Sequence, residues 1–164
     1  MLVIADTLGL ARYAGSLVTI GYGQQAHQSD LLAALQQTHE APAETPEPRG
    51  DFAGHFAGAD AKVDVTYLTA NEHHNPMEPH ASTVCYQADG SLVIHDKTQG
   101  TQNCQEYLHN VFGLPKDKLR VKAAFVGGAF GSGLRPQYQL PLAVMAALHL
   151  KRSVRLTLTR QQMF

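Results

Sequence analysis

Apolar residues recur along the chain at two spacings, one typical of strands and the other typical of helices. Six short runs are rich in β-branched or aromatic residues or alternate apolar with polar side chains, and these features predict strands. The runs are residues 18–22, 63–68, 81–87, 92–98, 119–126 and 154–159. Asp89-Gly90 separates the third run from the fourth. Because this dipeptide is typical of tight turns, the two runs are predicted to form a hairpin.

Four other segments carry apolar side chains at the spacing of a helix that buries one side. They are a helix capped by Asp6, a short helix from Ser29, residues 101–112 and residues 140–150. Thr101 is a reasonable N-cap for the third helix, and Gly113 is typical of a helix end. Beyond residue 50 the predicted order is β-β-β-α-β-loop-α-β, which indicates an α+β fold: a mixed β-sheet with packed helices.

Composition suggests how the chain is organised. Residues 40–50 hold three prolines and three glutamates, which precludes regular structure there. We interpret this segment as a linker between residues 1–39, a small α/β piece, and residues 51–164, the main unit. With 164 residues, 44% of them hydrophobic, the chain is long enough to bury one ordinary core.

Cysteine spacing and apolar run lengths limit the class of protein. Cys85 and Cys104 are too far apart for a CxxC metal or redox motif. No apolar run reaches the length of a membrane-spanning helix, and the first residues lack the pattern of an export signal. We therefore expect a soluble chain without membrane insertion, and the residues do not distinguish cytoplasm from periplasm.

Charge is distributed unevenly along the chain. Residues 118–164 contain eight Lys and Arg and no Asp or Glu, whereas residues 1–117 hold all fourteen carboxylates. The basic part includes a glycine-rich loop, Gly127–Gly133, which directly follows the predicted strand 119–126. Glycines let a ligand approach backbone N–H groups, and basic surroundings favour an anionic ligand. The spacing G-G-x-x-G-x-G fits neither the dinucleotide-binding motif nor the P-loop.

Two side chains, one in this loop and one at the end of a predicted strand, are candidates for ligand contact. Phe130 is a costly residue to leave in a solvent-exposed turn, so we interpret it as a positioned aromatic ring flanked by free N–H groups. Gln99 ends a predicted strand, which is the usual place for ligand contacts in sheets that carry helices. We predict that the two converge on one hollow that receives a charged ligand.

Other residue clusters favour less specific interpretations. Three histidines fall within residues 73–80, but two prolines there exclude the helix that a metal site of this spacing would need. Glu78 and His80 are instead predicted to form hydrogen bonds inward, to neighbouring loops. The basic residues lack interleaved exposed aromatics and any nucleic-acid-binding signature, so no nucleic-acid partner is predicted.

The ordered combination of these motifs resembles the molybdopterin-binding large subunit of the xanthine dehydrogenase / aldehyde oxidoreductase family, the molybdenum hydroxylases. The motifs are His74-Asn75-Pro76-Met77-Glu78-Pro79-His80-Ala81, Thr98-Gln99, Gly113-Leu114-Pro115, Val126-Gly127-Gly128-Ala129-Phe130-Gly131 and Leu158-Thr159-Arg160. The resemblance is clearest over residues 60–164. Residues 1–22 look like the tail of the preceding α/β domain, and residues 131–138 look most like a bacterial, periplasmic aldehyde-oxidising branch.

The resemblance implies roles for particular positions. Gln99 would approach the oxo side of the molybdenum, and the backbone of residues 128–131 would bind the apical oxo group and the pterin. The implied cofactor-binding residues are Gln99, Gly128, Ala129, Phe130 and Gly131. The implied substrate-channel residues are Phe130, Leu134 and Arg135. No residue of the chain is expected to ligate the metal directly.

The resemblance also implies a cofactor, partners and a reaction. The cofactor is molybdenum–molybdopterin, with the cytosine dinucleotide form as one option, and iron–sulfur and FAD groups would lie on partner subunits. The family loop commonly ends in Gly-Lys with a Glu after it in purine oxidisers, whereas Gly133 and Leu134 stand here. This difference favours an aldehyde, oxidised to a carboxylic acid, over xanthine.

The family's catalytic glutamate lies C-terminal of the residues given, so the resemblance implies a segment of a large subunit with no catalytic residue of its own. We expect it to be inactive without the remainder of that subunit. The residues leave two alternatives open: a stand-alone anion- or nucleotide-binding module that uses Gly127–Gly133, and a purely structural assembly domain.

Overall fold

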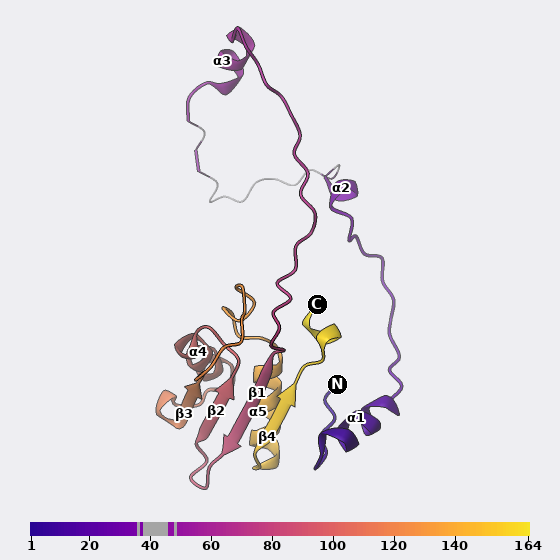
Figure 1. Cartoon of the computed structure of the whole chain (residues 1–164), viewed down its shortest axis with the longest axis vertical. Coiled ribbons are helices and arrows are strands. Elements are labelled where there is room, and N and C mark those ends of the chain that lie inside the picture. Colours follow the sequence, from indigo (N-terminus) through magenta and orange to yellow (C-terminus); the bar gives the residue numbers. More distant parts are fainter. Residues whose placement is uncertain (36, 38–45, 48) are drawn as a thin grey trace. The chain divides into compact units, whose positions relative to one another are not determined.

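The computed structural model describes residues 1–35, 37, 46–47 and 49–164 (Figure 1). These residues form two units, Met1–Leu68 and Thr69–Phe164. Most of the predicted linker, residues 40–45 and 48, lies outside the described residues. Gln99 and the glycine-rich loop belong to the second unit, so the candidate site is built entirely there.

The first unit contains three short helices. They are α1 (Leu8–Ser16), α2 (Leu31–Ala34) and α3 (Phe52–Gly58). The prediction that Asp6 caps the first helix is wrong by one position, because the Thr7 side chain accepts the hydrogen bond from Leu10 N at 3.2 Å. The sequence pattern did not predict α3, which Asp51 caps.

Two predicted strands are wrong. Residues 18–22 and 63–68 have no regular secondary structure. Tyr22 is 83% exposed and Leu68 79% exposed. A strand satisfies its backbone groups only by pairing with another strand, and neither segment has such a neighbour among the described residues. High β-propensity was therefore not sufficient to make either segment a strand.

The second unit is built on a four-stranded mixed sheet. Its strands are β1 (Ala81–Tyr86), β2 (Leu92–Asp96), β3 (Leu119–Lys122) and β4 (Val154–Thr157). The spatial order is β3-β2-β1-β4. The predicted hairpin is confirmed, because β1 pairs antiparallel with β2, and β4 adds antiparallel to the other edge of β1. Only β3 runs parallel to its neighbour β2, so the fold class is the predicted α+β with a mixed sheet.

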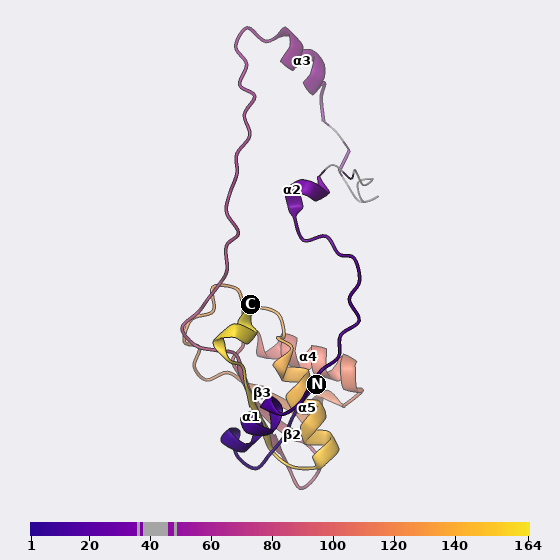
Figure 2. The same cartoon turned by 90° about the vertical axis from the view of Figure 1, so that its right-hand side faces the viewer.

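Two helices cover one face of this sheet: α4 (Thr101–Phe112) and α5 (Gln139–Leu150) (Figures 1 and 2). Helix α4 connects the parallel strands β2 and β3, which require such a crossover. The core lies between this face and the two helices. Its buried residues are Val84, Leu92, Ile94, Cys104, Leu108, Leu119, Leu140, Ala143, Val144 and Ala147. None of the described helices has the length and apolar character needed to cross a membrane.

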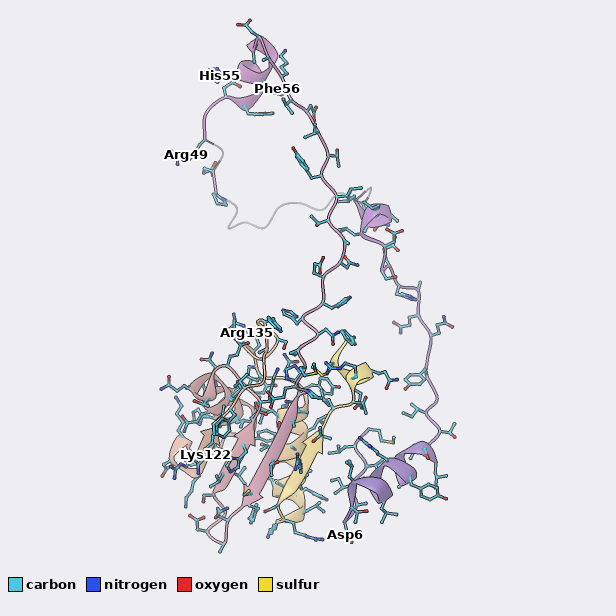
Figure 3. All side chains as sticks on the ribbon, viewed as in Figure 1. Asp6, Arg49, His55, Phe56, Lys122 and Arg135 are labelled. Carbon is cyan, nitrogen blue, oxygen red and sulfur yellow. The ribbon has the colours of Figure 1, made fainter. Side chains whose placement is uncertain are left out.

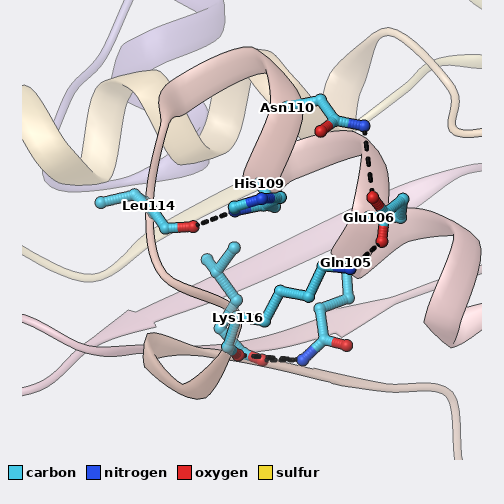
Figure 4. Close-up of polar contacts among 7 residues, drawn as sticks. Gln105, Glu106, His109, Asn110, Leu114 and Lys116 are labelled. Carbon is cyan, nitrogen blue, oxygen red and sulfur yellow. Dashed lines mark hydrogen bonds and ion pairs between the residues drawn. The ribbon is translucent and has the colours of Figure 1, made fainter.

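The ends of α4 determine where β2 and β3 meet the loops. Gly100, not Thr101, is the N-cap, and no side chain caps the helix, so the predicted Thr101 cap is wrong. Gly113 is left-handed with φ of 66°, as predicted for the helix end. The Gln105 amide donates to the Lys116 carbonyl at 3.0 Å and to the Leu119 carbonyl at 2.7 Å (Figure 4). These bonds join α4 to the start of β3.

The strand predicted over residues 119–126 is shorter in the structure. It ends at Lys122, because the next residues turn away from the sheet toward the glycine-rich loop. Figure 3 shows Lys122 beside the sheet and Arg135 on the loop beyond it. The loop therefore extends past the ends of the strands, on the same side as the residues that follow β2.

Candidate functional site

The glycine-rich loop curls tightly between β3 and α5. Ser132 N donates to the Ala129 carbonyl at 2.9 Å, and Leu134 N donates to the Gly131 carbonyl at 3.0 Å. Positive φ angles of 87° at Gly128, 53° at Phe130 and 95° at Gly131 bend the backbone. Glycine adopts such angles without strain, whereas a bulky residue such as Phe130 rarely does. Backbone strain of this kind gathers at functional sites.

The centre of the loop presents unpaired backbone donors. Within the part of the chain that the structure describes, the N–H groups of Gly128, Ala129, Phe130 and Gly131 donate no hydrogen bond. Ala129 is only 6% exposed. Gly128 is half-buried, and Phe130 and Gly131 are exposed, so the rule that buried N–H groups are nearly always paired applies to Ala129 alone. A run of donors at an accessible loop is suited to an acceptor outside this chain. Oxygen atoms of an anionic group fit this requirement.

Gln99 lies against the C-terminal end of the loop. Its backbone N donates to the Gly133 carbonyl at 2.9 Å, and a Cβ placed on Gly133 would lie 3.6 Å from Gln99 Cγ. The Gln99 side chain itself is exposed. The structure thus brings Gln99 and the loop together from positions more than thirty residues apart. The predicted ligand contacts of both remain predictions.

Phe130 is 77% exposed, so its ring is not packed into the hydrophobic core. The ring borders a shallow hollow of about 400 Å³. The hollow is lined by Phe130, Glu72, His73 and His74. Leu134 is 48% exposed and Arg135 is also exposed, but neither lines this hollow. Of the three predicted substrate-channel residues, only Phe130 lines this hollow, and the substrate channel remains a prediction.

The histidine-rich segment packs close to the loop. A Cβ on Gly131 would lie 3.5 Å from His74 Nε2. Among the residues that the structure describes, no group of three His, Cys, Asp or Glu side chains is arranged to hold a metal ion. Glu78 forms the inward hydrogen bond predicted for it, to Gly127 N at 2.5 Å. His80 is buried, but its Nδ1 has no hydrogen-bond partner among the described residues.

Sequence reasoning missed a buried polar group beneath the site. The Asp96 carboxylate, at the end of β2, accepts hydrogen bonds from the Ser82 hydroxyl and, at 3.5 Å, from the Gln139 amide. Burial raises the pKa of Asp96 above its ordinary value, and these hydrogen bonds oppose that shift. Asp96 continues the alternation of Leu92 and Ile94, which both face the core. That alternation was the signal that could have placed this carboxylate inside.

A buried cation lies next to Asp96 in the sequence. Lys97 is 4% exposed, and its Nζ has no hydrogen-bond partner among the described residues. Burial lowers the pKa of Lys97, and the charges of Glu78 and Asp96 oppose that shift. Burial also lowers the pKa of His80, with a further contribution from the Lys97 charge. A positive charge on His80 is therefore disfavoured beside Lys97.

Cys104 is predicted to be chemically inert in the folded chain. It is fully buried, its thiol donates to Thr98 Oγ1 at 3.2 Å, and burial raises the pKa of the thiol to about 11. At pH 8 roughly one molecule in a thousand carries the reactive thiolate at this position. We expect iodoacetamide to modify half-buried Cys85 first and Cys104 only after unfolding. Peptide mass spectrometry with and without urea checks this, and equal rates in the folded chain contradict it.

Comparisons with known proteins agree on one family. Residues 36–164 match the family model of the molybdopterin cofactor-binding domain. The aldehyde oxidoreductase molybdenum-binding subunit PaoC of Escherichia coli strain K12 is 34% identical over 97% of this chain. The indole-3-acetaldehyde oxidase of Zea mays is 27% identical, also over 97% of it. The chain spans 22% of the length of PaoC and 12% of the maize protein.

Solved structures agree with this assignment. The aldehyde oxidoreductase from Desulfovibrio gigas is 28% identical, with a TM-score of 0.79 over 97% of this chain and 18% of that one. Quinoline 2-oxidoreductase from Pseudomonas putida 86 gives a TM-score of 0.82 over 97% of this chain and 21% of that one, at 22% identity. At that identity the second likeness supports the fold alone.

Proposed function

Because the chain belongs to the molybdopterin cofactor-binding domain family of molybdenum hydroxylases, we propose that Gln99 and the loop around Phe130 hold part of the molybdenum–molybdopterin site of an aldehyde-oxidising enzyme. One observation carries this proposal: among the described residues the N–H groups of residues 128–131 donate no hydrogen bond, and the backbone N of Gln99 bonds to Gly133 at the end of the same loop. When bound, the molybdenum centre supplies the two-electron oxidation of the substrate carbon.

The residues present fit such a group. Four loop N–H groups without a partner among the described residues, together with the Gln99 amide, are donors for oxygen atoms, and the loop is already folded. Preorganised donors stabilise negative charge without reorganising when it develops. Residues 118–164 add eight Lys and Arg and no carboxylate, which favours an anionic cofactor further. In this proposal Gln99, Gly128, Ala129, Phe130 and Gly131 bind the cofactor.

Aldehydes, oxidised to carboxylic acids, are the substrates that the loop favours. Phe130 and Leu134 are apolar and accessible, at 77% and 48% exposed, and Arg135 follows them. The loop itself ends in Gly133 and Leu134 and offers no carboxylate to pair with a purine ring. Two of the relatives are named for aldehyde oxidation, which supports the same choice. Phe130, Leu134 and Arg135 are accordingly proposed to border the substrate channel.

The proposal includes the surroundings of the segment. Residues 51–164 would form the N-terminal part of the cofactor domain, residues 40–50 a linker, and residues 1–39 the tail of a preceding domain. The remainder of the large subunit would supply the catalytic glutamate, so the chain alone would be inactive. Iron–sulfur and FAD groups on partner subunits would take the electrons, and the cofactor would be the plain or the cytosine dinucleotide form.

Replacing Gln99 tests the function. In the complete large subunit, Gln99→Leu is expected to lower the turnover of benzaldehyde about 100-fold, the scale of losing one charge-stabilising donor. Folding should be unaffected, because only the backbone of residue 99 bonds to Gly133. Gln102→Leu, on the exposed side of α4, is the control. Steady-state kinetics and molybdenum content by mass spectrometry are the measurements.

Two outcomes contradict the proposal. One is unchanged benzaldehyde turnover in Gln99→Leu. The other is a strong thermal stabilisation of the chain by ATP or inorganic phosphate, since a ligand that binds only the folded form raises the melting temperature. That result would favour the alternative, a stand-alone anion- or nucleotide-binding module.

A further inference from the structure

Each end of the glycine-rich loop is tied to a side chain that lies outside the loop. We propose that these two side chains, Glu78 and Thr98, are positioning residues that hold the loop in its ligand-ready shape before the ligand arrives. Together we call these two side chains and their hydrogen bonds the clamp. Its functional consequence rests on the proposed function, but the clamp itself is a property of the chain alone.

Glu78 holds the N-terminal end. Its Oε2 accepts a hydrogen bond from Gly127 N at 2.5 Å. A Cβ on Gly127 would lie 3.1 Å from Glu78 Cβ and 3.2 Å from Oε2, which is tighter than ordinary contact. Glycine at position 127 is therefore what lets the carboxylate come this close. A hydrogen bond to an ionised carboxylate is also stronger than one between neutral groups.

Thr98 holds the C-terminal end. Its hydroxyl donates to the Gly133 carbonyl at 3.2 Å and accepts from Gly100 N at 3.1 Å. The Cys104 thiol donates to the same oxygen at 3.2 Å. Thr98 is only 3% exposed, so water does not compete for these bonds. A buried hydroxyl with its donor and acceptor sites all used has one orientation, which fixes the position of Gly133.

The residues between the two ends remain free for a ligand. Within the described part of the chain, the N–H groups of residues 128–131 have no hydrogen-bond partner, whereas Gly127 and Gly133 are bonded to the clamp. Fixing both ends of a short loop lowers the entropy that is lost when a ligand orders its centre. Side chains outside the loop therefore determine how well its free donors are preorganised.

Glu78 places a carboxylate next to a site proposed for an anion, and Lys97 is the basic residue whose charge interacts with it. Lys97 is buried without a hydrogen-bond partner among the described residues, and the Glu78 charge opposes the effect of burial on its pKa.

The clamp is tested first without the cofactor, by amide hydrogen exchange of the complete chain. Thr98→Val is nearly isosteric but cannot bond Gly133, whereas Thr98→Ser keeps the hydroxyl. We expect Thr98→Val to speed exchange of the Gln99 and Gly100 amides about 10-fold and Thr98→Ser to restore the native rates. Thr101→Val, whose hydroxyl caps nothing, is the matched control.

Glu78→Ala provides an independent variant at a partly exposed position, should Thr98→Val fail to fold. It is expected to speed exchange of the Gly127 amide to a similar extent, with Glu78→Gln intermediate because its amide oxygen still accepts. Unchanged exchange in Thr98→Val, or in Glu78→Ala, overturns the clamp, whatever the function of the loop.

The functional consequence is measured in the complete enzyme. Thr98→Val and Glu78→Ala are expected to lower molybdopterin retention about 10-fold after gel filtration, with Thr98→Ser and Thr101→Val at the native level. Faster exchange with unchanged retention overturns the positioning role. If Gln99→Leu leaves turnover unchanged while the exchange results hold, the proposed function fails and the clamp stands.

Discussion

Replacing Gly131 with alanine is expected to lower the molybdenum content of the complete enzyme at least about 10-fold, the equivalent of roughly 1.4 kcal/mol. Gly131 has φ of 95°, a backbone angle that residues with a Cβ rarely adopt. Holding alanine there costs on the order of 1–3 kcal/mol, which the loop can avoid by changing shape. Its own N–H and that of Phe130 would then leave the arrangement that faces the ligand.

Gly133→Ala is the control in the same loop. Its φ lies outside the left-handed region, and a Cβ there would make only ordinary contacts, 3.5 Å from Gln99 N and 3.6 Å from Ala129 Cβ. We expect metal content close to that of the native protein. Elemental analysis of purified enzyme at matched folding, judged by circular dichroism, is the measurement. Equal metal content in the Gly131 variant and the native enzyme contradicts the role of the loop geometry.

Replacing Leu108 with alanine is expected to lower the free energy of unfolding of the second unit by about 2–5 kcal/mol. Leu108 is fully buried in the core between α4 and the sheet, so its removal leaves a cavity that the packed strands and α5 cannot collapse. A unit of this size has only about 5–15 kcal/mol of stability in total. The loss is therefore a large part of what holds the site together.

Val111→Ala, on the same helix, is the matched control. Val111 is 50% exposed and lies outside the core cluster. Alanine also has the higher helix propensity, so we expect a change within about 0.5 kcal/mol. Because the chain has no tryptophan, urea denaturation of both variants is followed by far-UV circular dichroism. Similar midpoints for the two variants contradict the assignment of Leu108 to the core.

The sequence alone was sufficient for the elements whose signals are local. Helix α4 with its Gly113 end, helix α5 and the hairpin of β1 and β2 all follow from short-range spacing and turn residues. The predicted strands 18–22 and 63–68 failed because a strand depends on a partner that propensity does not report. The Thr101 cap failed because Thr101 is already the first helical residue, Gly100 is the N-cap and no side chain caps the helix.

The site divides in the same way. The glycine content and the charge of residues 118–164 predicted the loop, and the ordered motifs predicted the family, since each of these signals is carried by short stretches of sequence. Only the tertiary structure decided that Gln99 meets Gly133, that Glu78 reaches Gly127 and that Asp96 and Lys97 are buried. These contacts join residues 34 to 49 positions apart or depend on how the sheet packs, and no local pattern encodes such distances. Local chemistry thus determined what the loop can bind, and long-range packing determined how firmly it is held.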